Sequence, residues 1–306
     1  MPTRRPANSR RFPDRGRRRA AADAPVRRKT RSLTGSIRKP VAAGLLYPER
    51  KETLAASLRR FIPKSVSGKT KAVGLVIPHG SWNGCGPLIG EVLSSLQWPA
   101  RVVVLGPTHE RTAPAGCFIQ TQGQWQMPGG TLKIDEPLAR LILEKNPEMT
   151  ADPEFLLDEY VHELPLPFLQ KIGKVKKFVP VVVQTLDGAV IGRLAQALAA
   201  LAQAFPDEKI YWIATTQIAS YTPTEAARQQ VALVMDRIRA MDSEGLIEAV
   251  FNRKIEMCGA GAVAAVLQAA QICGARAANE ISSQVVGSPD AAVGMISVLF
   301  EEGQKR

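Results

Sequence analysis

The sequence of 306 residues contains no apolar run that approaches the eighteen or so residues needed to span a bilayer. No such run follows the N-terminal arginines either, where the core of a signal peptide would lie. We therefore expect no membrane segment and a cytoplasmic protein. Hydrophobic residues still make up 45% of the chain, which is enough to bury a core and predicts a globular body.

Cysteine and histidine are both scarce. The four cysteines, at positions 85, 117, 258 and 273, form no CxxC pair, and a chain of this size does not need disulfides to fold. We expect free thiols, one of which could be a metal ligand. The chain has only three histidines, so the position of each one carries information.

Acidic residues are nearly missing from the start of the chain. Residues 1–39 hold 14 of the 40 Arg and Lys residues but 2 of the 28 Asp and Glu residues, so the rest carries 26 of each sign. The body therefore gives no electrostatic indication of a nucleic-acid partner. Residues 1–37 contain one aromatic residue, Phe12, and are predicted to be a disordered Arg-rich tail. This composition fits four interpretations of the segment: an RNA-binding arm, a transit-like sequence, a solubilising tail, or residues that result from an upstream start codon.

From Pro40 onwards, short β-branched runs alternate with amphipathic segments, a pattern typical of α/β folds. Strands are predicted at 72–78, 101–106, 178–183, 209–216 and 292–299, and helices at 50–61, 87–96, 136–145, 167–172, 190–204, 224–241 and 261–272. The first strands are apolar on both faces, as expected when helices cover a sheet on each side. We predict one domain over residues 38–303 that forms a three-layer α/β/α sandwich.

Two of the three histidines follow predicted buried strands. His79 comes directly after the strand that ends at Pro78, and His109 follows the strand that ends at Gly106. Ligands bind at the carboxyl ends of strands in an open α/β sheet, so both imidazoles could face one crevice. Each could instead be a structural histidine that caps its loop, but two at equivalent strand ends favour a shared site.

Cys258 lies just before an alanine-rich segment, residues 262–270, that is predicted to be a buried helix. The exposed N–H groups at a helix start stabilise a thiolate, which makes such a cysteine a better metal ligand or nucleophile. The position would also be explained by a small buried residue that packs near Gly259 and Gly261. From spacing alone, this second interpretation is favoured.

Five segments match known family motifs in order, over about 260 residues. They are Ala43–Pro48 (A-G-x-x-Y-P), Ile77–Trp82 (A-P-H-A-G-Y), Leu105–Glu110 (L-G-P-S-H-H), Glu159–Gln170 (E-H-S-L-E-V-Q-L-P-F-L-Q) and Met257–Val263 (I-C-G-x-x-P-I). Each motif is weak alone, and the ordered set is fairly specific. On this basis the chain resembles the Memo family, or protein B of the AmmeMemoRadiSam system, which is related to the LigB-like class III extradiol dioxygenases.

The resemblance implies a mixed, largely parallel central sheet and places the family's metal ligands on His79, His109 and Cys258. Two imidazoles and a thiolate form a soft, open site suited to iron(II) or copper, and zinc is also possible. The resemblance further implies two partners, an AMMECR-type protein and a radical SAM enzyme.

The pocket around these ligands departs from the family pattern. Within the family's S-S-D-F-S-H-Y segment, Gln217 replaces the aspartate and Ser220 the histidine, while Tyr221 is kept. Tyr160 stands at a further histidine position, and Trp82 ends the first strand motif. Because Gln and Ser cannot act as bases near neutral pH, we expect less capacity for proton transfer.

Two carboxylates remain as candidates for a base or an additional ligand. Glu110 replaces a histidine next to His109, and Glu163 is retained from the family motif; either could equally be a solvated loop charge. His162 is offset by two residues from the family's histidine position, so we expect it to point elsewhere. Two functions follow from these observations: a metal-binding protein with redox or dioxygenase-like activity, or a non-catalytic scaffold whose degenerate pocket holds a small molecule or peptide.

Overall fold

The structure is a computed structural model that describes residues 37–65, 69–98 and 100–301. The predicted tail lies outside the described residues except for Ile37, which belongs to the first strand. Residues 302 and 303, the last two of the predicted domain, also lie outside them. Among the described helices, none is long and apolar enough to cross a membrane.

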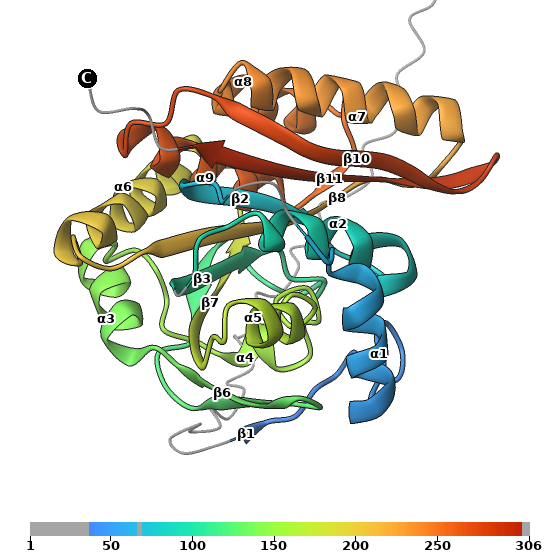
Figure 1. Cartoon of the computed structure of the whole chain (residues 1–306). Helices are drawn as coiled ribbons and strands as arrows, with labels where there is room; N and C mark the ends of the chain where they lie inside the picture. Colours follow the sequence, from blue (N-terminus) through green and yellow to red (C-terminus); the bar gives the residue numbers. More distant parts are fainter. Residues whose placement is uncertain (1–36, 66–68, 99, 302–306) are drawn as a thin grey trace, which may run out of the picture. The chain divides into compact units, whose positions relative to one another are not determined.

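One mixed sheet runs through the described body (Figure 1). Its strands are β1 (Ile37–Arg38), β2 (Ala72–Pro78), β3 (Arg101–Gly106), β4 (Gly116–Ile119), β5 (Gln124–Met127), β6 (Gly130–Ile134), β7 (Lys177–Gln184), β8 (Ile210–Thr222), β9 (Met257–Cys258), β10 (Ala278–Ser288) and β11 (Ala291–Glu301). The order is β1-β5-β6-β7-β3-β8-β2-β11-β10, with β4 beside β7 and β9 beside β8. The four central strands β7, β3, β8 and β2 are parallel, so their carboxyl ends meet at one edge.

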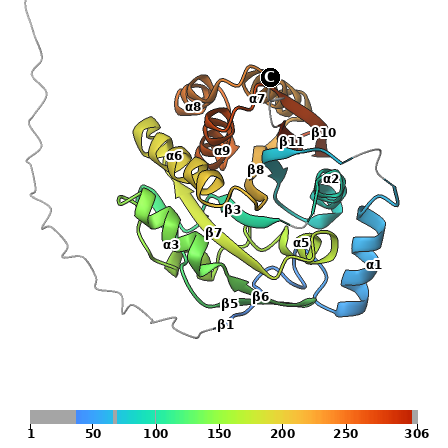
Figure 2. The same cartoon turned by 60° about the vertical axis from the view of Figure 1, so that its left-hand side comes forward.

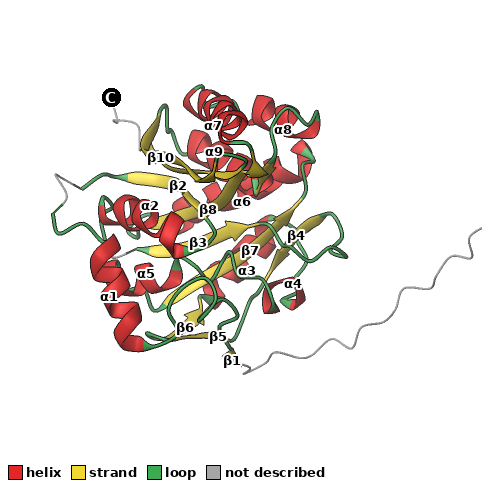
Figure 3. Ribbon diagram, turned by 90° about the vertical axis from the view of Figure 1, so that its right-hand side faces the viewer, coloured by secondary structure: helices red, strands yellow, loops and turns green. Residues whose placement is uncertain are grey.

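Helices cover both faces of this sheet, which confirms the predicted three-layer sandwich. They are α1 (Lys51–Phe61), α2 (Trp82–Ser94), α3 (Glu136–Lys145), α4 (Glu154–Leu157), α5 (Leu166–Ile172), α6 (Gly188–Ala204), α7 (Thr224–Arg239), α8 (Ser243–Phe251) and α9 (Ala260–Ile272). The group α1, α2 and α5 packs together on one face, as Figure 3 shows. Figure 2 shows α3, α6 and α9 on the opposite face. The central residues of strands β2, β3, β7 and β8 are buried between these layers.

Two boundaries differ from the predictions near the strand ends where the histidines lie. Helix α2 begins at Trp82 instead of Pro87, because its glycines allow close packing that outweighs their poor helix propensity. A Cβ atom at Gly86, within the part of the helix that was not predicted, would lie 2.7 Å from the Phe61 ring. Strand β8 continues past Thr216 to Thr222, because β9 and β11 pair with its last residues.

Candidate metal centre

The two histidines come together at the carboxyl edge of the parallel strands. Strands β2 and β3 pair with β8 from its two sides, so the residues that follow them flank β8 at the same edge of the sheet, and the rings of His79 and His109 come within 5.8 Å of each other, centroid to centroid. The backbone N–H of His79 donates to the carbonyl of Thr216 at 3.0 Å, which fixes this residue against β8. One ligand atom from each of His79, His109 and Cys258 lies within 4.8 Å of the other two. The predicted convergence of these three residues is therefore confirmed.

Cys258 reaches the site through β9, which pairs with the end of β8 and places Cys258 opposite Gln217. The Thr216 hydroxyl donates to the Cys258 carbonyl at 2.8 Å. Gly259 then turns the chain into α9 with a φ of +80°, and a Cβ atom there would lie 2.2 Å from the Thr215 carbonyl oxygen. This turn therefore requires glycine. It holds the Cys258 Sγ atom 3.3 Å from His109 Nε2. The four cysteines are free thiols, as predicted.

His79 is the buried member of the cluster, with 1% of its surface exposed. Neither ring nitrogen has a hydrogen-bond partner among the described residues. Burial first of all, and also the nearby His109, lower the pKa of His79 to about 3, so the ring is neutral at physiological pH. Buried polar atoms are nearly always paired, because an unpaired group loses its hydration without compensation. An unpaired neutral imidazole beside a second imidazole and a thiol fits a metal ion.

His109 is the more exposed member and is held by Glu159. Its Nδ1 atom lies 3.1 Å from both carboxylate oxygens, and its backbone N–H donates to the same group. Without an ion, the hydrogen bond with Cys258 and the hydrogen bond with Glu159 raise the pKa of His109 to about 10. Burial would raise the pKa of Glu159, but its hydrogen bond and charge interaction with His109 outweigh that effect and lower the pKa to about 2. A carboxylate on Nδ1 directs Nε2 towards the cluster.

Tyr160 covers one face of His109. The ring centroids are 5.0 Å apart and the planes differ by 12°, so the two rings stack. Burial raises the pKa of Tyr160 to about 12, which keeps the phenol neutral at physiological pH. The backbone N–H of Tyr160 donates to the Glu159 carboxylate at 2.9 Å. Glu159 and Tyr160 therefore hold two sides of the same imidazole.

Three of the predicted pocket residues lie on the end of β8. Gln217 is opposite Cys258, and its Nε2 atom donates to the Ser220 hydroxyl at 2.7 Å. Tyr221 is 80% exposed. Ala219 and Tyr221 have φ values of +53° and +55°, in the left-handed region that non-glycine residues seldom adopt. This stretch is neutral, and its backbone strain is stored next to Cys258.

The other predicted site residues have different surroundings. Trp82 is packed between Tyr47 and Phe168, with ring centroids 5.1 and 4.6 Å away, and only 2% of its surface is exposed. Glu110 is exposed and accepts hydrogen bonds from the backbone N–H and the hydroxyl of Thr112. Nothing in these contacts assigns either residue a chemical role.

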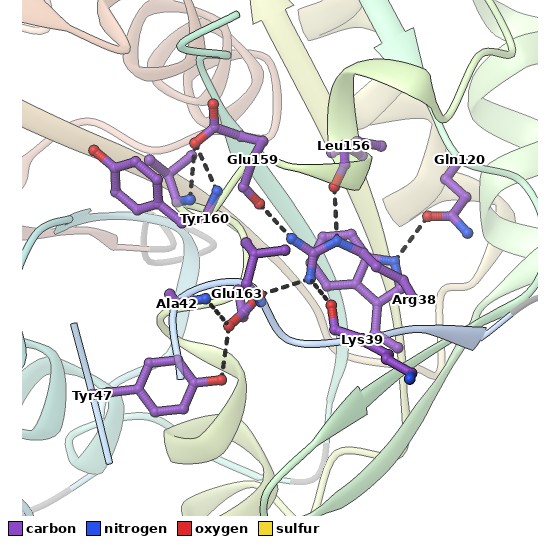
Figure 4. Close-up of polar contacts among 12 residues, drawn as sticks. Arg38, Lys39, Ala42, Tyr47, Gln120, Leu156, Glu159, Tyr160 and Glu163 are labelled. Atoms are coloured by element: carbon purple, nitrogen blue, oxygen red, sulfur yellow. Dashed lines mark hydrogen bonds and ion pairs between the residues drawn. The ribbon is translucent and has the colours of Figure 1, made fainter. Parts of the chain in front are cut away.

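Glu163 is fully buried and uses both oxygens within the N-terminal part of the described chain. It pairs with Arg38 at 2.6 Å and accepts from the backbone N–H groups of Val41 and Ala42 and from the Tyr47 hydroxyl (Figure 4). These four donors hold the segment that precedes α1 against the body. His162 is not a member of the cluster, and its Nε2 atom donates to the Val181 carbonyl at 2.8 Å.

Glu159 supports His109 at this site, and the sequence alone predicts no role for it. It was visible as the first residue of the family motif that runs to Gln170. A carboxylate that orients a ligand from fifty positions away has no spacing signal of its own. Only the retained motif, read together with the histidine it supports, could have identified Glu159.

Comparisons with known proteins show the family of this chain. Residues 38–299 match the family described as Memo-like protein. A MEMO1 family protein of Methanopyrus kandleri is 30% identical over 283 residues, covering 87% of this chain and 99% of the relative. A MEMO1 family protein of Thermotoga petrophila is 32% identical over 248 residues, covering 75% and 87%.

A solved structure supports the fold. The crystal structure of an uncharacterized protein from Escherichia coli K12 matches with a TM-score of 0.50 and 15% identity, covering 74% of this chain and 99% of the other. At this level of identity the similarity concerns the arrangement of strands and helices alone.

Proposed function

Because this chain belongs to the Memo-like family, we propose that it binds one redox-active metal ion, iron(II) or copper, through His79, His109 and Cys258. The observation that carries the proposal is the buried, unpaired imidazole of His79 beside a second imidazole and a thiol. Two nitrogens and one sulfur leave coordination positions for a further ligand. Zinc is the third candidate, because His and Cys satisfy it as well.

A bound iron or copper ion would supply redox chemistry of the oxidoreductase or dioxygenase type, and the side chains of this chain would hold and orient the reactants around it. Glu159 keeps the Nδ1 proton on His109, so that Nε2 can act as a ligand. Glu110 is exposed one residue from a ligand, and we propose it as the carboxylate that exchanges protons with solvent. We assign Glu163 to anchoring the N-terminal segment, because its oxygens already accept four hydrogen bonds.

One observation favours a second function, a non-catalytic protein that holds a small molecule or peptide in the same pocket. Tyr160, Gln217 and Ser220 stand where the resemblance places two histidines and an aspartate. Gln217 and Ser220 are also hydrogen-bonded to each other. A pocket with these neutral side chains can bind a ligand through hydrogen bonds but has few groups that transfer protons near pH 7.

Elemental analysis of protein purified without a histidine tag tests the metal site. We expect close to one ion per chain in the wild type and less than a tenth of that in His109→Ala and Cys258→Ser. His162→Gln and Cys273→Ser are matched controls outside the cluster and should keep the ion. Equal, substoichiometric metal in all five proteins would refute the proposal.

Oxygen uptake separates the two functions. The reduced, metal-loaded wild type should consume oxygen with a catechol-type substrate if it is an oxidoreductase, and Glu110→Gln should slow this reaction. Full metal loading without oxygen uptake for any catechol offered would favour the binding function.

Partners and location are proposed on family resemblance and composition alone. An AMMECR-type protein and a radical SAM enzyme should co-purify with the tagged chain from its own cell extract, in the cytoplasmic fraction. RNA association through residues 1–37 is a weaker proposal. It predicts that binding falls steeply with salt and disappears when these residues are removed.

A further inference from the structure

We infer that Arg38 is a positioning residue for His109, acting through the loop that carries Glu159 and Tyr160. Figure 4 shows its guanidinium at the centre of this network. The Nε atom donates to the Leu156 carbonyl at 2.8 Å, and one terminal nitrogen donates to the Glu159 carbonyl at 2.6 Å. The other terminal nitrogen pairs with Glu163 at 2.6 Å. The Arg38 side chain thus contacts this loop at three points, Leu156, Glu159 and Glu163. These points lie before, within and after the pair of residues that contacts His109.

The held loop determines where the second ligand of the proposed metal centre lies. Its Glu159 carboxylate contacts His109 Nδ1, and its Tyr160 ring stacks on the imidazole. The same carboxylate also accepts the backbone N–H groups of Tyr160 and Val161, so the loop and the carboxylate move together. A shift of the Glu159 carbonyl away from Arg38 would therefore displace both groups that fix the imidazole.

The surroundings of Arg38 select arginine over lysine. Its side chain is 3% exposed, and its guanidinium carbon lies 3.8 Å from the centre of the Trp125 ring. The Trp125 indole N–H in turn donates to Gln120 at 2.8 Å, which fixes the ring below the guanidinium. A planar fork can donate in three directions at once while it stacks on an aromatic face. A lysine ammonium keeps the charge but cannot reach both loop carbonyls from one point.

A simpler interpretation makes Arg38 only the charge partner of the buried Glu163. The two interpretations differ in what Arg38→Lys and Glu163→Gln do. Arg38→Lys keeps a positive charge for Glu163 and gives up the contacts with the Leu156 and Glu159 carbonyls. Glu163→Gln removes the charge partner and leaves both carbonyl contacts in place. A positioning role predicts that the lysine variant disturbs His109 more than the glutamine variant does.

Histidine NMR of the metal-free protein tests this directly, because the chain has only three histidines. In the wild type, His109 should show a low-field Nδ1 proton and ring protons shifted upfield by Tyr160. Arg38→Lys should broaden or remove the Nδ1 signal and reduce the upfield shift, with the His162 signals unchanged. Glu163→Gln and Arg101→Lys, which alters a separate ion pair with Asp135, should leave the His109 signals in place.

Metal affinity supplies a second readout that rests on the proposed function. Cobalt(II) titration, followed by its visible absorption, should give a dissociation constant about tenfold higher for Arg38→Lys and unchanged for Arg101→Lys. If Arg38→Lys and Glu163→Gln lower the melting temperature but leave both the His109 signals and the affinity as in the wild type, the inference is overturned. If no variant and not even the wild type binds cobalt(II), the metal proposal fails, and the NMR spectra alone decide the role of Arg38.

Discussion

The ring of Tyr160 lies flat against the imidazole of His109, with 5.0 Å between centroids and 12° between planes. The resemblance to the family places a histidine at position 160. At this position the chain carries a phenol that stays neutral and stacks on His109, where a histidine could titrate. Its contribution should be orientation instead of proton transfer.

Replacing Tyr160 separates these two contributions. Tyr160→Phe keeps the stacked ring, so cobalt(II) affinity should stay within twofold of the wild type. Tyr160→Ala removes the stack, worth about 1 kcal/mol, and should weaken binding about fivefold. Isothermal titration of the metal-free proteins measures both. Equal affinity in the alanine variant would mean that the stack does not orient His109.

Glu159 should matter more than Tyr160, because its carboxylate contacts His109 Nδ1 directly. Glu159→Gln keeps an oxygen that can accept backbone hydrogen bonds but loses the charge that supports the ligand. We expect cobalt(II) affinity to fall about 10- to 100-fold, as is usual for a carboxylate behind a ligating histidine. Glu136→Gln, in an exposed pair with Arg140, is the control and should bind as the wild type does. An unchanged dissociation constant for Glu159→Gln would contradict the proposed support.

The central strands could be predicted because their apolar runs are long and bounded by turn residues. Several of the elements that the sequence did not predict are very short, such as β9 with two residues, or polar, such as β10. Strand β9 exists only because the end of β8 is present to pair with it. Helix α2 was predicted to begin five residues late, since Gly86 disfavours a helix locally but lets Phe61 approach closely. Contacts made by the folded chain decide such cases.

The three residues of the cluster, His79, His109 and Cys258, could be predicted because each follows or precedes a recognisable element. The residues that support them could not be predicted. Arg38, the Glu159 carboxylate and the Tyr160 ring come from segments about 120 residues apart along the chain, brought together by the loop contacts of Arg38. Glu163 appeared in sequence as a candidate base, and only its four donors indicate an anchoring role. Side-chain partners of this kind have no fixed spacing in a sequence.

The anchoring role predicts a large loss of stability when Glu163 is neutralised. Glu163→Gln would leave Arg38 buried without its charge partner, which should lower the free energy of unfolding by about 3 kcal/mol. Tyr47→Phe removes only one of the four donors and should cost about 1 kcal/mol. Urea denaturation of metal-free protein checks the order of the two effects. A loss below 1 kcal/mol for Glu163→Gln would show that the pair is not needed to hold the N-terminal segment.

Burial of His162 predicts how stability depends on pH. Burial lowers the pKa of His162 to about 4 in the folded protein, whereas an unfolded histidine has a pKa near 6.5. The unfolded chain therefore binds a proton that the folded chain does not, and the stability that His162 contributes is complete above pH 6.5. It is lost as the pH falls from 6.5 towards 4, at about 1.4 kcal/mol per pH unit at most.

His162→Gln keeps an N–H donor for the Val181 carbonyl and cannot titrate. Between pH 6.5 and 4.5, the free energy of unfolding of this variant should fall less steeply than that of the wild type. The difference between the two slopes should be at most the contribution of one proton, about 1.4 kcal/mol per pH unit. Urea denaturation at several pH values gives both slopes, and metal-free protein is used so that ion release does not contribute. Parallel slopes would mean that His162 takes up its proton equally well in the folded state, which its complete burial argues against.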